Sequence, residues 1–518
     1  MQIHTGKKAL VMALRNPGRV QAAIPQAKVL KQAANGSLLA VPHTFDVFRV
    51  LNNIGIKAPQ PMLSYYDWPG RFTPYAHQKD TAAFLSRNRR AYCLNGMGSM
   101  KTLSTLWAYD YLRSIGQARR MLVLAPLSTL EMTWAREVFN NFPHLECTVL
   151  HGTKARRLKL LKQPADVYVI NHDGLKVIAD ELLARDDIDV LTIDELAVFR
   201  NARIDRWKVC KKLVDKSRFA WGLTGTPCPN SPEDAFGQIR LLTPENAPRS
   251  FTMFQDMVSR PVGPYKRVAK HDAMETVYKL MQPSIRYATR DCVDLPPTVY
   301  QMRSVPLEGD QLKAYKKMRD QKVFELGDRR TVAVNEAVVA MKLIQIACGA
   351  VLTGADEDPV RIESPERMAV VKEVIAEADG KVIVFCPVIG ALDYIADVLR
   401  NAGMHIGQID GRVPKWKRDE VFADFQDGGA TQVIVAQPGA MSHGLTLTAA
   451  SVIIWYAPCY SNETYEQANA RIVRPGQKRT TVIVRIEGTA LERLIYERLE
   501  RRGKLQGELL EMVEAEGT

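Results

Sequence analysis

Residues 95–102 have the residue types and spacing of a phosphate-binding loop, Asn-Gly-Met-Gly-Ser-Met-Lys-Thr. In such a loop, backbone N–H groups at a helix N-terminus surround the anion, the lysine reaches the terminal phosphates, and the hydroxyl ligates magnesium. Met100 stands where the last glycine is normally found. If this position requires a positive φ, a Cβ there costs roughly 1 kcal/mol. We therefore expect a working nucleotide site with slow turnover.

An acidic pair, Asp194-Glu195, follows the apolar run Val-Leu-Thr-Ile. In nucleotide hydrolysis, an aspartate at such a strand end holds magnesium and a glutamate polarises the attacking water. Either segment alone has a simpler explanation, because a glycine-rich turn can arise by chance and an acidic pair can cap the next helix. Since the two occur in the expected order within one α/β region, we interpret them as two halves of one site.

The elements that must position these residues form two regions with the same alternation of strands and helices. Short apolar runs alternate with helical or turn segments from residue 91, and again from residue 381. Near-continuous apolar strands alternating with helices indicate parallel sheets covered on both faces. We expect an α/β fold with a small accessory domain at residues 1–70, a first lobe at 71–295, and a second lobe at 296–518 that ends in a charged helical tail.

Composition limits the class of protein. The chain is 46% hydrophobic and 25% charged, and it has no apolar stretch of the roughly 20 residues that span a bilayer, so we expect no membrane segment. The N-terminal apolar patch is too short and too soon interrupted for a signal peptide. Eight singly spaced cysteines without zinc-ligand spacing indicate reduced thiols. These features favour a cytoplasmic protein, and the net charge of +13 favours a polyanion such as nucleic acid.

Four segments together resemble a known family: residues 95–102, 194–201, 223–230 and 465–479. They are similar to motifs I, II, III and VI of the superfamily-two ATPases, most closely those of the Swi/Snf-like double-stranded DNA translocases. The last segment is the most specific, with the pattern Gln-Ala-x-x-Arg-x-x-Arg-x-Gly-Gln. The resemblance covers about residues 71–500, and the compact chain is similar to bacteriophage and bacterial members.

This resemblance implies two RecA-like lobes, with ATP in the cleft between them and duplex DNA crossing both. Lys101 would then bind the β- and γ-phosphates, Thr102 and Asp194 would hold magnesium, and Glu195 would activate water. Arginine fingers from the second lobe would neutralise charge on the γ-phosphoryl group, and they are Arg471 and Arg474. The other nucleotide contacts that the resemblance implies are Gln78 at the adenine, Gly96 and Gly98 in the loop, and Gly444 and Gln467 at the lobe interface.

The resemblance also implies residues that transmit hydrolysis to DNA. Those that would couple the nucleotide site to the DNA track are Thr224, Gly225 and Thr226. Those that would contact the DNA backbone are Ser128, Thr129, Arg412 and Thr446. Ala197 stands where the family has a polar residue or histidine. We therefore expect coupling, rather than hydrolysis, to be weakened.

These expectations converge on an ATP- and magnesium-dependent DNA translocase, a helicase-like motor that remodels DNA or protein–DNA intermediates. It would act as a monomer on double-stranded or branched DNA in the cytosol of a bacterium or phage-infected host, with residues 1–70 available to a protein partner. Two alternatives stay open. One is a strand-separating or branch-migrating helicase, and the other is a catalytically weak, nucleotide-gated DNA-binding module.

Overall fold

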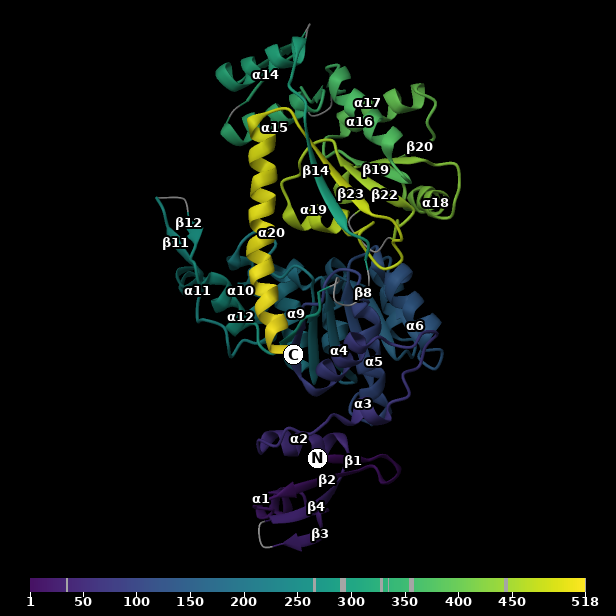
Figure 1. Cartoon of the computed structure of the whole chain (residues 1–518), viewed down its shortest axis with the longest axis vertical. Coiled ribbons are helices and arrows are strands. Elements are labelled where there is room, and N and C mark those ends of the chain that lie inside the picture. The colour runs from purple at the N-terminus through teal and green to yellow at the C-terminus, as the bar shows by residue number, and fades with distance from the viewer. Residues whose placement is uncertain are drawn as a thin grey trace.

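The structure is a computed structural model, and it describes residues 1–33, 36–263, 267–288, 295–326, 329–333, 335–353, 358–441 and 446–517. The molecule is elongated: a small N-terminal unit lies at one end, a first lobe in the middle and a second lobe at the other end (Figure 1). Within the described chain, no helix is both long and apolar enough to cross a membrane.

Residues 1–53 form a compact unit, which we call the N-terminal unit. Its four-stranded antiparallel sheet has the order β1-β2-β4-β3, with bounds Gln2–His4, Ala9–Leu14, Gly36–Pro42 and Lys28–Ala33. Alternate residues of β2 and β4 are buried, as expected for a sheet with one covered face. The covering helices are α1 (Gly18–Ala23) and α2 (Phe45–Asn53), which place Val20 and Leu51 against Leu10 and Leu39.

The N-terminal unit shares hydrophobic packing with the first lobe. Phe45 and Phe48 of α2 and Met62 of α3 (Pro61–Tyr65) lie in the same buried cluster as Trp107. The Tyr66 hydroxyl donates a 2.6 Å hydrogen bond to the Asp110 carboxylate of the lobe. The unit is thus packed onto the lobe and not merely tethered to it.

The first lobe contains a seven-stranded parallel sheet of order β13-β5-β10-β9-β6-β8-β7. Its strands are Ser284–Ile285, Arg90–Cys93, Phe219–Leu223, Ile188–Asp194, Arg120–Ala125, Val167–Asn171 and Cys147–Val149, in that order. Its helices include α4 (Ala76–Arg87), α5 (Lys101–Ser114), α6 (Arg136–Asn141), α7 (Lys154–Leu161), α8 (Ala179–Leu183), α9 (Asp205–Lys216), α10 (Ala235–Leu242), α11 (Phe251–Val258) and α12 (Ala273–Leu280).

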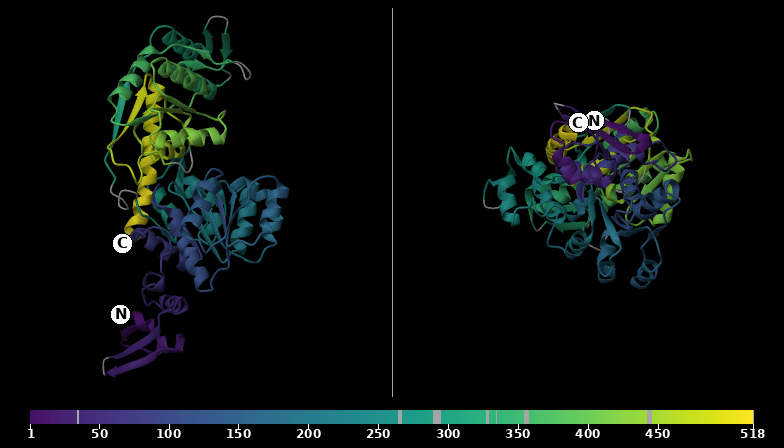
Figure 2. Two further views of the ribbon diagram at one scale, coloured as in Figure 1. Left: turned by 90° about the vertical axis from the view of Figure 1, so that its right-hand side faces the viewer. Right: turned by 90° about the horizontal axis from the view of Figure 1, so that it is seen from below.

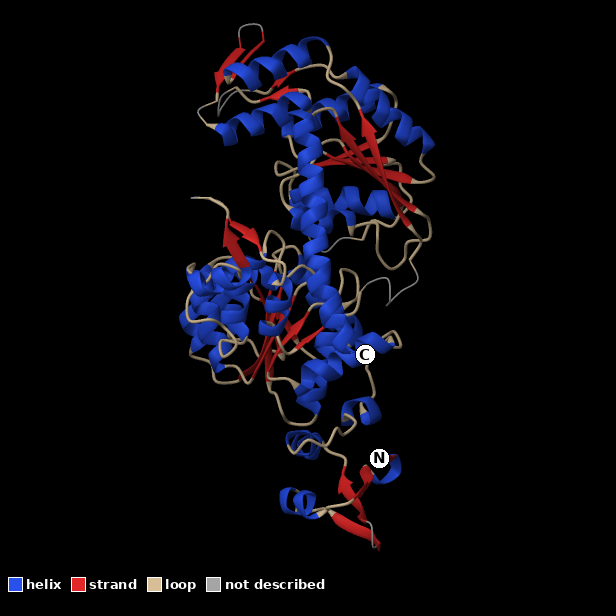
Figure 3. Cartoon of the chain, turned by 60° about the vertical axis from the view of Figure 1, so that its left-hand side comes forward, coloured by secondary structure: helices blue, strands red, loops and turns tan. Residues whose placement is uncertain are grey.

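Successive strand residues of this sheet enter two different cores. Met121 and Val123 of β6 pack with α4 and α5, whereas Leu122 and Leu124 pack with α9 and α10 on the other face. This explains why the strands are apolar throughout and do not alternate with polar residues. Figure 3 shows the strands enclosed between helices.

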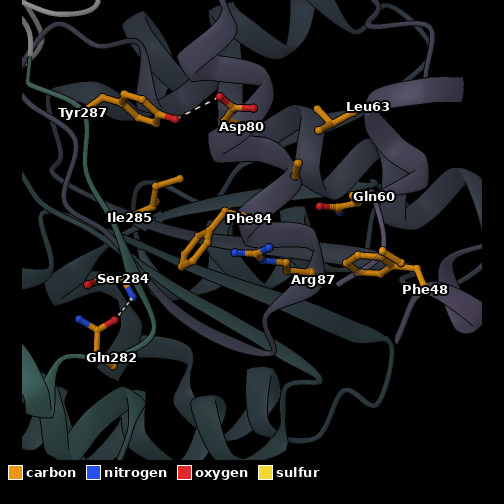
Figure 4. A pocket seen from close by; sticks show the side chains of 12 residues that line it. Phe48, Gln60, Leu63, Asp80, Phe84, Arg87, Gln282, Ser284, Ile285 and Tyr287 are labelled. Atoms are coloured by element: carbon orange, nitrogen blue, oxygen red, sulfur yellow. Dashed lines mark hydrogen bonds between the residues drawn. The ribbon is translucent and has the colours of Figure 1, made fainter. Parts of the chain in front are cut away.

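The junction between the N-terminal unit and the first lobe encloses a pocket of about 510 Å³. Side chains from α3, α4 and β13 line it, and the Tyr287 hydroxyl donates a 3.1 Å hydrogen bond to Asp80 across one side (Figure 4). This pocket is separate from the phosphate-binding loop, because none of residues 95–102 lines it.

The main sheet of the second lobe is a six-stranded parallel sheet of order β14-β23-β22-β19-β21-β20. Its strands are Thr298–Ser304, Thr481–Glu487, Ala450–Trp455, Lys381–Phe385, Val433–Ala436 and Ile406–Ile409. The helices are α14 (Gly309–Gln321), α15 (Glu336–Ala347), α16 (Pro365–Glu377), α17 (Ile389–Asn401), α18 (Lys415–Gln426), α19 (Asn462–Asn469) and α20 (Ala490–Gly517). Short antiparallel pairs join β11 (Ser259–Pro261) to β12 (Arg267–Ala269), β15 (Val323–Leu326) to β16 (Arg329–Val332), and β17 (Ala350–Val351) to β18 (Val360–Arg361).

The expected charged tail is a single long helix, α20, that runs from the second lobe along the first (Figure 1). Its first turns are fixed in the second lobe by an ion pair of 2.9 Å between Arg367 and Glu492, both almost fully buried. Further along, α20 lies beside α12 of the first lobe, and the Arg502 guanidinium donates to the Asn230 side chain at 3.5 Å. The helix therefore bridges the two lobes.

The expected fold class is confirmed: two α/β lobes built on parallel sheets, preceded by a small accessory unit. Domain boundaries after residues 70 and 295 stay proposals. The second falls between the last strand of the first sheet, β13, and the first strand of the second sheet, β14. The first is less sharp, because α2 and α3 contribute to the core of the first lobe.

Candidate active site

Three neighbouring strands of the first lobe end at the same edge of the sheet. Leu223 at the end of β10 pairs with Cys93 on one side and with Asp194 on the other. The loop after β5, the acidic pair at the end of β9, and residues 224–226 after β10 therefore meet at one place. In parallel α/β sheets, ligands bind at this carboxyl edge.

The phosphate-binding loop has a left-handed turn at Met100, with φ 56° and ψ 43°, directly before α5. Gly98 also has a positive φ, 81°. Among the residues that the structure describes, only five non-glycine residues have a positive φ, and Met100 and Glu195 are two of them. The expected conflict at Met100 is thus present, since a side chain in this conformation costs about 1 kcal/mol or more.

Lys101 bonds to its own loop. Its Nζ donates to the carbonyl oxygens of Asn95 and Gly96 at 2.9 and 3.0 Å. These bonds hold the ammonium group at the mouth of the loop. Binding of a triphosphate requires Lys101 to exchange these carbonyls for phosphate oxygens.

Asp194 is held by two donors. Trp134 Nε1 donates to its Oδ2 at 2.9 Å, and the backbone N–H of Glu195 donates to its Oδ1 at 3.1 Å. Trp134 is fully buried and lies in the π-helical turn Leu130–Ala135 that follows β6. The sequence gives no local sign of this contact, because Trp134 lies 60 positions before the carboxylate.

Asp194 and Thr102 fit a magnesium ion. Both offer hard oxygen donors, and magnesium in nucleotide sites is held by one or two such ligands together with substrate phosphates. No cluster of three or more potential metal-ligating side chains occurs in the described part of the chain, so a site made of protein ligands alone is not offered there.

Burial changes the pKa values of the acidic pair. It raises the pKa of Asp194, and burial together with the neighbouring Asp194 carboxylate raises the pKa of Glu195 to about 7. Lys101 and Arg471 act in the opposite direction on Glu195. The site thus favours the arrival of positive charge beside these carboxylates.

The second lobe completes the site. A cavity of about 120 Å³ is lined by residues of both lobes, namely Met97, Gly98, Lys101, Thr129, Asp194, Glu195, Gln467, Ala470, Arg471 and Arg474. A Cβ on Gly98 would come within 3.0 Å of the Pro475 side chain, so the loop and the second lobe are in close contact. The cavity is smaller than the roughly 300–1,000 Å³ of typical ligand pockets, so the cleft must widen to admit a nucleotide.

Two neighbouring arginines of the second lobe border the cavity, Arg471 buried and Arg474 partly buried. Burial, followed by the proximity of Arg474, lowers the pKa of Arg471 to about 9, and burial lowers the pKa of Arg474. Two neighbouring guanidinium groups that have lost solvent gain from an anion between them. Further ion pairs link the lobes around the cavity, from Arg200 to Glu463 at 3.5 Å and from Lys415 to Glu131 at 3.4 Å.

Gln78 is buried in the first turn of α4. Its Oε1 accepts a 2.9 Å hydrogen bond from the Tyr75 backbone N–H, whereas its Nε2 has no partner among the described residues. The adjacent His77 ring lies 3.3 Å from the Ser99 carbonyl of the phosphate-binding loop. Gln78 thus has a donor to spare close to this loop.

The segment expected to couple the site to DNA lies against the phosphate-binding loop. The Thr226 N–H donates to the Thr224 hydroxyl at 3.1 Å, and Gly225 is close enough to Met97 that an added Cβ would contact it at 3.4 Å. Ala197 is fully buried in the short turn Leu196–Phe199. It has no polar side-chain atom with which to join this segment.

The expected DNA contacts differ in their surroundings. Ser128 and Thr446 are exposed. Thr129 is buried and lines the cavity, and its hydroxyl donates to the Pro126 carbonyl; its expected contact with DNA stays a prediction. Arg412 is partly exposed but pairs with Asp410 and Asp393 at 2.8 and 2.7 Å, so its charge is already balanced. Gly444 lies outside the described residues.

Comparison with known proteins identifies the family. A family model described as SNF2-related domain matches residues 77–348, and one described as Helicase conserved C-terminal domain matches residues 366–476. Protein p41 of Acyrthosiphon pisum secondary endosymbiont phage 1 is 24% identical over 467 residues, covering 85% of this chain and 98% of p41.

Longer relatives match over part of their length. An ATP-dependent helicase of Mycoplasma genitalium is 24% identical over 75% of this chain, which corresponds to 37% of that helicase. Human DNA annealing helicase and endonuclease ZRANB3 is 24% identical over 84% of this chain and 40% of its own length. Among solved structures, the Sulfolobus solfataricus SWI2/SNF2 ATPase core in complex with dsDNA aligns with 20% identity and a TM-score of 0.40, covering 87% of this chain and 95% of that one.

The SNF2-related model alone covers more than half of the chain, and the helicase model follows it in order. The family resemblance inferred from the motifs is therefore confirmed. This chain belongs to the SNF2-related family of ATP-dependent helicase and translocase motors.

Proposed function

We propose that this protein hydrolyses ATP with magnesium and uses the closing and opening of its two lobes to move along duplex DNA. The observation that carries the proposal is the cavity between the lobes, to which one lobe contributes Lys101 and Glu195 and the other contributes Arg471 and Arg474. A site divided in this way is complete only when the lobes are closed. Hydrolysis is then linked to relative movement of the lobes.

On the first lobe, each group has a distinct task. Lys101 moves from the loop carbonyls to the β- and γ-phosphates, and Gln78 uses its spare Nε2 donor at the adenine. Asp194 and Thr102 would hold magnesium, which would supply positive charge beside the phosphates. Glu195 accepts the proton of the attacking water, because its carboxylate lies beside Asp194 at the edge of the same cavity.

On the second lobe, Arg471 and Arg474 stabilise the γ-phosphoryl group during transfer. Burial lowers the pKa of both side chains, and a phosphoryl anion beside them would favour their charged forms. Gln467, on the same side of the cavity, completes the lobe interface. This arrangement disfavours an open cleft, and it also disfavours a closed cleft without substrate. It favours closure of the two lobes when ATP is bound.

The DNA part of the proposal is supported by charge and by family. The net charge of +13 favours a polyanion, and the segment at residues 224–226 lies directly against the phosphate-binding loop, where it can transmit nucleotide state. Ser128, Thr446 and Arg412 stay proposed backbone contacts, with Arg412 exchanging its carboxylate partners for phosphate. The expected result of movement is remodelling of DNA or of protein–DNA complexes.

The experiment is a measurement of ATP hydrolysis without nucleic acid and with single-stranded, duplex or forked DNA, using wild type and Glu195→Gln. We expect duplex DNA to give the strongest stimulation and Glu195→Gln to abolish it while ATP still binds. If ATP is not hydrolysed under any of these four conditions but still changes DNA binding, the protein is a nucleotide-gated DNA-binding module and not a motor.

A further inference from the structure

The N-terminal unit carries much of the protein's positive charge. Residues 1–53 contain seven lysines and arginines but a single acidic residue, Asp46. The unit is about a tenth of the chain, yet its net charge of +6 is nearly half of the total of +13. Such an imbalance in a small folded unit points to an anionic partner.

Strand register places two of these cations on the uncovered face of the sheet. Lys28 pairs with Ala40 and Lys31 with Leu38, and Ala40 and Leu38 alternate along β4 with the buried residues Leu39 and Val41. Both lysines are exposed. They therefore project from the face opposite α1 and α2, and Figure 2 shows the whole unit projecting from the end of the first lobe that is remote from the second.

A third cation, Arg15, lies with Lys31 at a shallow groove of about 410 Å³. Arg15 and Lys31 border this groove, and Ala13 and Leu38 contribute to its apolar lining. Gly36 is required at its end, because a Cβ there would come within 2.7 Å of the Leu14 carbonyl oxygen. Within the described chain, Arg15, Lys28 and Lys31 have no carboxylate partner, in contrast to Arg412.

We propose that this outer sheet face, defined by Arg15, Lys28 and Lys31, is a second DNA contact that binds the phosphate backbone outside the motor cleft. The inference rests on the proposed function, from which the identity of the polyanion follows. The other outward residues of β2 and β4 include Ala9, Val11, Ala13, Leu38 and Ala40, none of which is charged, so the cations are the only charged side chains among them.

DNA fits this face better than an acidic protein does. Lys28 and Lys31 lie opposite Ala40 and Leu38, which are two residues and therefore about 7 Å apart along β4, and duplex DNA presents one charge per about 1.7 Å of its axis. Each cation can thus lie close to a phosphate at many positions of the unit along the duplex. A motor that moves along DNA requires this. An acidic protein would need its carboxylates at matching positions, and the face has no buried polar anchor to fix them.

The test compares two full-length variants that each lose three positive charges from the same unit. Arg15→Gln/Lys28→Gln/Lys31→Gln removes the outer-face cations, whereas Lys7→Gln/Arg19→Gln/Arg49→Gln removes cations from the helices and the β1–β2 turn. Duplex DNA binding is measured by fluorescence anisotropy with a labelled blunt duplex at several salt concentrations between about 50 and 200 mM. ATP hydrolysis at saturating duplex is measured in parallel.

We expect the outer-face variant to bind duplex DNA at least tenfold more weakly, and the slope of log affinity against log salt to fall in magnitude by about 2.7, since each of the three lost phosphate contacts removes about 0.9. Its hydrolysis rate at saturating DNA should equal that of wild type, and the control variant should retain the wild-type slope.

Equal losses of affinity and slope in the two variants, or no loss in either, would overturn the proposal. Binding of the outer-face variant to DNA at wild-type affinity, together with loss of an acidic protein partner, would assign the face to protein instead. If wild type shows no DNA-stimulated hydrolysis, the proposed function fails independently of this comparison.

Discussion

Trp134 donates its indole N–H to the Asp194 carboxylate at 2.9 Å, and so joins the turn after β6 to the proposed magnesium ligand. The same turn contains Thr129, which lines the cavity, and Glu131, which pairs with Lys415 of the second lobe at 3.4 Å. One short segment therefore contacts the Asp194 carboxylate, the cavity and the opposite lobe.

Replacement of Trp134 by phenylalanine should loosen Asp194 while keeping most of the apolar packing. Loss of a hydrogen bond to a metal ligand typically costs 10–100-fold in metal affinity or activity, so we expect the magnesium concentration for half-maximal hydrolysis to rise about tenfold. Binding of a fluorescent ATP analogue with magnesium should weaken, whereas its binding without magnesium should not. Trp207→Phe is the matched control, because Trp207 donates to the Gly237 carbonyl away from the site. The same magnesium dependence in both variants would refute a positioning role for Trp134.

Met100→Gly should speed hydrolysis. Glycine adopts the observed φ of 56° without strain, and relief of about 1 kcal/mol in a loop that must rearrange corresponds to about fivefold in rate. Met100→Ala keeps the Cβ and therefore serves as the control that should leave the rate near that of wild type. Steady-state kinetics on duplex DNA measures both. If the alanine variant gains as much rate as the glycine variant, the Met100 side chain slows hydrolysis and the backbone conformation does not.

Arg471→Ala and Arg474→Ala should each reduce kcat by about 10³ if they act as arginine fingers. Nucleotide binding to the first lobe should be much less affected, because Lys101, Thr102 and Asp194 are unchanged. Single-turnover hydrolysis and fluorescent nucleotide binding separate the two effects. Arg498→Ala, an exposed arginine on α20, is the control and should behave as wild type. Equal loss of binding and hydrolysis in the two finger variants would instead indicate a structural role in the lobe interface.

Glu492→Gln should destabilise the start of α20. Glu492 is the buried ion-pair partner of Arg367 and also accepts from the Gly488 N–H at 2.8 Å. Removing one charge of a buried pair costs about 3–5 kcal/mol, because the other charge stays buried and unpaired. Chemical denaturation should show this loss, and the exposed Glu497→Gln should not. If both variants are equally stable, Arg367 must find another partner.

The sequence predicted the parts of the site that local chemistry determines. Lys101 and Asp194 each follow an apolar strand, and parallel strands bring such ends together, so their meeting at one sheet edge could be inferred before the structure. The positive φ at Met100 could also be anticipated, because the position is one that glycine normally occupies. These inferences depend on residues next to each other in the chain.

Long-range packing could not be inferred in the same way. The contact between Trp134 and Asp194, the inward position of Thr129, and the path of α20 beside α12 depend on how separate elements pack. The ion pair of Arg412 with Asp393 is another example, since Asp393 lies on α17 and Arg412 lies in the turn after β20. Nothing in the local pattern around these residues distinguishes an exposed from a packed position.

The central claim is that ATP hydrolysis moves this protein along duplex DNA, and displacement of a triplex-forming strand from a duplex tests it most directly. We predict ATP-dependent displacement by wild type, none by Glu195→Gln, and no separation of the strands of a plain duplex under the same conditions. Separation of forked duplex strands without triplex displacement would instead show a strand-separating helicase. Hydrolysis without displacement of either kind would contradict the account, because the two-lobe site would then turn over ATP without driving movement.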